Sequence, residues 1–77
     1  MESSEVRKYR EAQEWVNESR KVMVQAEIAF NSNPTEETGW ALSVAQSDWR
    51  RDIDIRIKRS ESLTDAEYDS LMAERRS

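Results

Sequence analysis

Residues 9–30, YREAQEWVNESRKVMVQAEIAF, carry the pattern from which the fold is predicted. The apolar and small residues of this stretch recur at alternating steps of three and four, the heptad spacing that places them on one stripe of a helix. The members of this seam are Tyr9, Ala12, Val16, Ser19, Met23, Ala26 and Phe30. Every second member is small, so another helix can approach closely along the whole length. The pattern predicts a helix-packing protein.

Long helices are expected on both sides of a central break, because the chain has a single Gly and a single Pro. We predict a first helix over about residues 4–30, a turn over 31–33 and a second helix over about 34–59. Gly39 lowers the helix propensity near the start of the second helix by about 1 kcal/mol relative to Ala. A connection this short normally leaves two helices side by side, which predicts an antiparallel hairpin.

The start of the second helix carries a capping signal. Asn33 can cap the helix, and Pro34 fits a first turn in which the missing amide hydrogen needs no partner. Glu36 follows Asn33 at the spacing of a capping box. We therefore expect Asn33 to be the N-cap and Pro34 the first helical residue.

A short third helix is predicted over about residues 65–76, after a polar connector over 60–64. Thr64 and Glu67 have the spacing of a capping box at its start. A helix of about 12 residues is marginal by itself, so we expect it to pack back on the hairpin as a lid. Its expected apolar contacts are Ala66, Leu71, Met72 and, at the edge, Tyr68.

The second helix is expected to present two apolar faces, because its apolar residues fall on two nearly opposite stripes. One stripe, expected to pack on the first helix, is Leu42, Ala45, Trp49, Ile53 and Ile57. The other is Trp40, Val44 and Ile55. A helix with two apolar faces needs two neighbours, so the third helix or a second protomer is expected to cover the other stripe.

Residues 52–58, DIDIRIK, offer an alternative, since they alternate polar and β-branched residues as a half-buried strand does. Such a strand could pair only with its symmetry mate in a dimer, which is a weak arrangement without helices packed on it. A ribbon-helix-helix repressor needs two helices after the strand, and only one short helix follows Lys58. We therefore predict helix here, and the fold class is all-α.

Length and composition favour self-association. A chain of 77 residues has room for one domain and buries a small share of its surface. It has neither Cys for disulfides nor His for a usual zinc site, and its 36% hydrophobic content is a lean supply for a monomeric core. We therefore predict a homodimer in which two hairpins form a helical bundle.

The charge pattern argues against nonspecific binding to nucleic acid or to a membrane. The net charge is −4, with acidic and basic residues interspersed. The longest aliphatic run, residues 22–24, is far shorter than a membrane helix or the core of a signal peptide. The sequence therefore predicts a cytoplasmic location.

No residue pattern predicts catalysis, a metal site or a cofactor. A chain without His lacks the most common general acid or base, and no Gly-rich elbow surrounds any Ser. The carboxylate groups lack the Glu-x-x-His partners of two-metal helical sites and the loop of a calcium site. These groups are Glu11, Glu14 and Glu18 on the first helix and Asp48, Asp52 and Asp54 on the second. We expect solvated helix faces and no enzyme activity.

A basic cluster marks the end of the second helix and has two interpretations. Cations near a helix C-terminus stabilise the helix dipole by about 0.3–1 kcal/mol each, which accounts for them without any ligand. Alternatively they contact the phosphates of DNA or RNA. The residues are Arg50, Arg51, Arg56, Lys58 and Arg59.

The three Trp residues and a thin aliphatic patch suggest a binding surface. Trp15 and Trp49 are expected in the core, whereas Trp40 lies on the opposite stripe and is a candidate interface anchor. On the first helix, Val6, Val24 and Ile28 lie off the seam and form a second patch. The interface residues that we predict are Trp40, Val44, Ile55, Val24 and Ile28.

These patterns favour a noncatalytic protein–protein interaction module, acting as an adaptor, regulator or inhibitor. The alternative is a nucleic-acid-binding regulator that uses the basic end of the second helix. In its short length, helical pattern and lack of His and Cys, the chain resembles accessory proteins of phages and other mobile elements. That resemblance rests on no definable motif.

Overall fold

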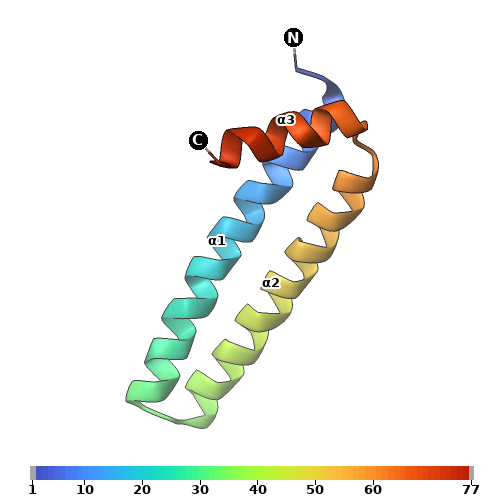
Figure 1. The fold of residues 1–77 in the computed structure, drawn as a ribbon. Helices are drawn as coiled ribbons and strands as arrows, with labels where there is room; N and C mark the ends of the chain where they lie inside the picture. The colour runs from blue at the N-terminus through green and yellow to red at the C-terminus, as the bar shows by residue number, and fades with distance from the viewer. Residues whose placement is uncertain (1, 77) are drawn as a thin grey trace.

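Within residues 2–76 the chain is all-α, with three helices (Figure 1). The computed structural model describes the backbone of residues 2–76 and the side chains of residues 2–75. Its helices are α1 (Ser4–Ser32), α2 (Glu36–Glu61) and α3 (Asp65–Arg76). No strand occurs in the described part of the chain, and the alternating segment 52–58 lies inside α2. The predicted fold class is confirmed.

Helices α1 and α2 run antiparallel along their whole length and form a layer two helices wide (Figure 1). The chain is elongated, with principal extents of 48 × 24 × 17 Å. The predicted antiparallel hairpin is therefore confirmed. No helix within residues 2–76 has an apolar stretch that could cross a bilayer.

The turn between α1 and α2 differs from the sequence prediction. Asn33 is the C-cap of α1, and its backbone N–H donates to the carbonyl of Ala29. The N-cap of α2 is Thr35, whose hydroxyl accepts from the backbone N–H of Thr38 at 3.1 Å. Thr38 in turn accepts from the backbone N–H of Thr35 at 2.9 Å, which completes a capping box.

The reciprocal bonds of Thr35 and Thr38 account for this correction. Proline disfavours the helical backbone for the residue before it, so α1 ends with Asn33 as its C-cap, which has φ −149° and ψ 79°. Thr35 has the extended backbone of an N-cap, with φ −122° and ψ 168°, so α2 begins after Pro34 and Glu36 is its first residue.

The predicted capping box of α3 is present. The backbone N–H of Thr64 donates to Oε1 of Glu67 at 3.0 Å, and the backbone N–H of Glu67 donates to the Thr64 hydroxyl at 3.2 Å. The hydroxyl of Ser3, the N-cap of α1, also donates to Glu67. This bond and those from Thr64 lower the pKa of the Glu67 carboxyl. One carboxylate thus joins the starts of two helices.

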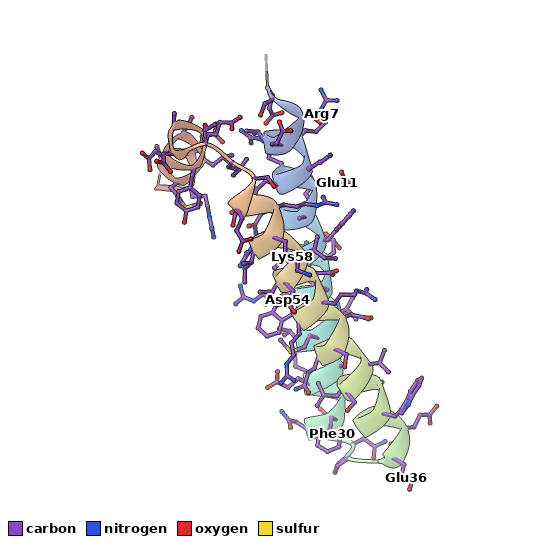
Figure 2. All side chains as sticks on the ribbon, turned by 90° about the vertical axis from the view of Figure 1, so that its right-hand side faces the viewer. Arg7, Glu11, Phe30, Glu36, Asp54 and Lys58 are labelled. Carbon is purple, nitrogen blue, oxygen red and sulfur yellow. The ribbon has the colours of Figure 1, made fainter. Side chains whose placement is uncertain are left out.

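Helix α3 packs as a lid across the N-terminal end of α1. Leu71 is buried with Val6 and Tyr9, and Leu63 and Met72 pack against this cluster. Val6, predicted as part of a surface patch, is 8% exposed because α3 covers it. Ala66, predicted to contact the hairpin, is exposed. Figure 2 shows α3 on one side of the two-helix layer.

The α1 seam faces α2 as predicted, with its most buried members at Tyr9, Ala12 and Val16. On α2 the observed seam differs from the predicted stripe beyond Trp49. It continues at heptad spacing through Asp52, Arg56 and Arg59, which are buried or half-buried, whereas Ile57 is 49% exposed. Two helices that wind around each other keep a period of 3.5, so a stripe drawn at 3.6 drifts off the contact.

Candidate functional site

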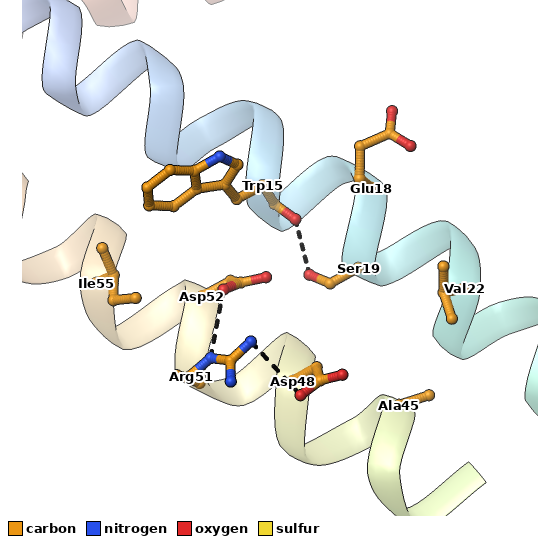
Figure 3. Close-up of a pocket in the computed structure, with 9 residues that line it drawn as sticks. All are labelled: Trp15, Glu18, Ser19, Val22, Ala45, Asp48, Arg51, Asp52 and Ile55. Atoms are coloured by element: carbon orange, nitrogen blue, oxygen red, sulfur yellow. Dashed lines mark hydrogen bonds and ion pairs between the residues drawn. The ribbon is translucent and has the colours of Figure 1, made fainter. Parts of the chain in front are cut away.

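The hairpin carries a groove between α1 and α2, which we call the acidic groove (Figure 3). Three carboxylates, one guanidinium and several apolar side chains line it. The lining residues are Trp15, Glu18, Ser19 and Val22 from α1 and Ala45, Asp48, Arg51, Asp52 and Ile55 from α2. Exposed apolar side chains at such a site are typical of a protein contact.

Asp52 is the most buried charged side chain of the described chain and lies at the bottom of the acidic groove. Nε of Arg51 lies 3.8 Å from Asp52, and Nη2 of Arg51 lies 3.5 Å from Asp48. The Ser19 hydroxyl faces the same groove but donates to the backbone carbonyl of Trp15 at 2.8 Å. Its only proton is therefore not given to Asp52, and the carboxylates keep acceptor capacity for a ligand.

Trp15 is 37% exposed at one end of the acidic groove, although the sequence predicts it in the core. The Arg59 guanidinium lies 4.6 Å from the centre of its ring, a cation–π contact. Arg59 also donates to the backbone carbonyl of Lys8 at 2.6 Å and lies 4.0 Å from Glu11. These contacts fix the indole at the edge of the groove.

The second groove, the arginine groove, also runs between α1 and α2. It contains three arginines, and no carboxylate is among the described residues that line it. Its lining residues are Gln13, Val16, Asn17, Arg20, Met23 and Val24 from α1, Trp49, Ile53 and Arg56 from α2, and Arg75 from α3. Arg56 is held in place because it donates to Oε1 of Gln13 at 3.1 Å.

The two grooves lie on opposite sides of the hairpin. Val22 lines the acidic groove and Val24 lines the arginine groove, and two residues of a helix project about 200° apart. Arg75 of α3 lines the arginine groove, so this is the side on which the lid packs. We call the side with the acidic groove the acidic side and the side with the arginine groove the basic side, and both grooves also have apolar lining residues.

The predicted interface residues are divided between these sides. Ile55 lines the acidic groove, and Val44 and Trp40 continue its stripe toward the turn at helical spacing. Val24 lines the arginine groove, and Ile28 follows one turn later. Trp40 is 72% exposed and Ile28 is 60% exposed. Ile55 lies closer to the seam than its predicted outer stripe implies, because it flanks Asp52.

The basic cluster is not gathered on one surface. Arg51 is in the acidic groove and Arg56 in the arginine groove, while Arg59 contacts α1. Arg50 and Lys58 are exposed on the outer side of α2. Arg51, Arg56 and Arg59 already have partners within the chain, so their placement lends no support to a phosphate-binding surface.

Trp49 lies half-buried beside the arginine groove, and its indole nitrogen is buried without an acceptor among the described residues.

From the sequence alone, the acidic side chains Glu18, Asp48 and Asp52 are candidates only for metal binding. Within the described residues, no group of three or more acidic side chains is arranged to hold a metal ion. The feature of the sequence that predicts the acidic groove is the heptad position of Asp52 on the α2 seam.

Comparison with known protein families, with curated proteins and with solved structures finds no match to this chain. The geometry of the two grooves is therefore the basis for a function.

Proposed function

We propose that this chain is a noncatalytic protein–protein interaction module, an adaptor, regulator or inhibitor that acts through the two faces of its helical hairpin. In this proposal the module self-associates into a helical bundle, with a dimer as the smallest assembly. The surface residues assigned to contact are Trp40, Val44, Ile55, Val24 and Ile28.

The observation that carries the proposal is the amount of large apolar surface left uncovered. Trp40 is 72% exposed, Ile28 60% and Val22 55%. Tryptophan is enriched among the residues that dominate binding energy, and exposed apolar patches are typical of contact sites. These exposed apolar side chains are suited to packing against another helix.

The small internal core supports self-association. The buried hydrophobic residues of the described chain are Val6, Tyr9, Ala12, Val16, Ala45 and Leu71. Two of these are alanines, which contribute little apolar area. A chain of this size commonly gains the rest of its stability from a partner. Covering Trp40 and Ile28 in an interface would supply that additional burial.

The experiment compares association and partner capture in the wild-type chain, Trp40→Ala and Val44→Ala. Light scattering over a concentration series measures self-association, and a pull-down from the native host lysate measures capture. We expect Trp40→Ala to weaken at least one of the two by tenfold or more, about 1.4 kcal/mol. Tyr68→Ala, which removes a 44% exposed aromatic ring from α3, is the matched control and should leave both unchanged.

Two results would contradict the proposal. One is that Trp40→Ala and Val44→Ala leave both self-association and capture intact. The other is a salt-dependent shift of duplex DNA or RNA that is lost when Arg50 and Arg51 are replaced by Glu, because that result favours a nucleic-acid-binding regulator.

A further inference from the structure

The two grooves of the hairpin carry opposite charge, and both also have apolar lining residues. In the acidic groove, Glu18, Asp48 and Asp52 outnumber Arg51. In the arginine groove, Arg20, Arg56 and Arg75 face no carboxylate among the described lining residues. Each groove therefore attracts a surface of the kind that the other presents.

We propose that the acidic groove of one copy binds the arginine groove of a second copy. This inference rests on the proposed function, since it names the partner and the mode of the protein contact. The contact is heterologous, because different surfaces of the two copies meet. It would bring Glu18 and Asp48 of one copy against Arg20 and Arg75 of the next.

The alternative, a two-fold dimer through the same groove on both copies, is disfavoured by charge. Two acidic grooves would bring Asp48 and Asp52 close to the same residues of the second copy, and two arginine grooves would bring Arg20 and Arg56 together. Like charges across an interface disfavour association.

The divided set of predicted interface residues agrees with the heterologous contact. Trp40, Val44 and Ile55 belong to the acidic side, and Val24 and Ile28 belong to the basic side. In a heterologous contact both groups lie in one interface, those of one copy against those of the next. Helix α3 occupies the open end of the basic side, so the second copy seats between α3 and the turn.

The test uses single charge reversals and their mixture. Asp48→Arg balances the charge of the acidic groove, and Arg20→Glu places a carboxylate beside the two arginines that remain in the other groove. We expect each variant alone to self-associate at least tenfold more weakly than wild type in sedimentation or light scattering. An equimolar mixture should recover association, because Arg20→Glu supplies the acidic groove that the arginine groove of Asp48→Arg requires.

Asp54→Arg and Arg50→Glu are the matched controls. Both residues are exposed on α2 and line neither groove, and the same charge changes there should leave association within about twofold of wild type. Circular dichroism of each variant checks the helical fold. If Asp48→Arg does not fold, Glu18→Arg, at a more exposed position of the same groove, replaces it.

Three outcomes would overturn the heterologous contact. If only one of the two reversals changes association, the contact joins like grooves. If neither changes it while the wild type associates, the interface lies elsewhere, and the Trp40 and Val44 results still decide the proposed function. If the wild type is monomeric at every concentration, self-association itself fails, and capture of another protein remains as the separate readout.

Discussion

The open end of the hairpin and its turn end are built from the same two helices but finished in different ways. At the open end, α3 buries Val6, Tyr9 and Leu71 and ties the two helix starts together through Glu67. At the turn end, Phe30 lies against Gly39 while Trp40 and Ile28 are exposed. At the open end a third helix covers the apolar side chains, and in our proposal a second chain covers those at the turn end.

Removing the lid contact should have the largest effect. Leu71→Ala deletes a side chain that is 6% exposed between Val6 and Tyr9. Large-to-small changes in a core cost about 2–5 kcal/mol of unfolding free energy. Urea unfolding followed by circular dichroism measures the loss. Tyr68→Ala on the same helix is the control, and an equal loss in both variants would show that the open end has no special core.

Overpacking the seam should cost less. Ala12 is fully buried where α1 meets α2, and Ala12→Leu forces the helices apart at a cost of about 1–3 kcal/mol. Ser19→Leu and Ala26→Leu, at half-buried seam positions nearer the turn, should cost less than Ala12→Leu. The exposed Ala29→Leu on the same helix controls for propensity. If none of the three seam variants has a lower melting temperature than wild type, α1 and α2 do not pack closely along the seam.

Replacing Gly39 near the turn should raise the free energy of unfolding by a smaller amount. Gly39 is helical without a positive φ, and a Cβ placed there would lie 3.4 Å from Cε2 of Phe30, an ordinary contact. Gly39→Ala should therefore add up to about 1 kcal/mol of unfolding free energy through helix propensity. A higher melting temperature in calorimetry would agree with this. A lower melting temperature would mean that the Phe30 ring cannot shift to accommodate the added Cβ.

Lowering the pH should destabilise the open end before the turn end, and this loss of stability is the smallest effect that we expect. Hydrogen bonds from Ser3 and Thr64 lower the pKa of Glu67. Stability from these bonds is complete above the ordinary glutamate pKa of about 4.3 and is lost as the pH falls through the lower folded value. Helix content measured from pH 6 to about pH 2 should fall less in Glu67→Gln than in wild type. Superimposable acid curves would contradict this role.

Local patterns predicted the elements because the interactions that decide them lie within a few residues. The short connection over residues 31–33 predicts the antiparallel hairpin, and the pair Thr64 and Glu67 predicts the start of α3. At the turn, the spacing predicts a capping box between Asn33 and Glu36, whereas the structure forms it between Thr35 and Thr38. The reciprocal hydrogen bonds of Thr35 and Thr38 fix the start of α2, and the spacing rule alone does not reveal them.

The candidate site was harder to predict because it depends on how two helices wind around each other. The 3.5-residue period moves Asp52 inward and Ile57 outward, and the position of α3 turns Val6 from a surface residue into a core residue. Opposite charge on the two sides of the layer emerges only when residues of both helices are combined, as with Glu18 and Asp48. A single helical wheel does not contain that information.

The polar residues of the α2 seam also settle how the two helices align lengthwise. A slip of one heptad would carry Arg59 into the place of Asp52 and Asp52 into the place of Ala45, and it would separate Arg56 from Gln13. A seam with a buried acid and a hydrogen-bonded arginine resists such sliding more than an unbroken aliphatic zipper does. Together with the short connection between Ser32 and Glu36, these residues hold the hairpin in one register, and the composition of both grooves follows from it.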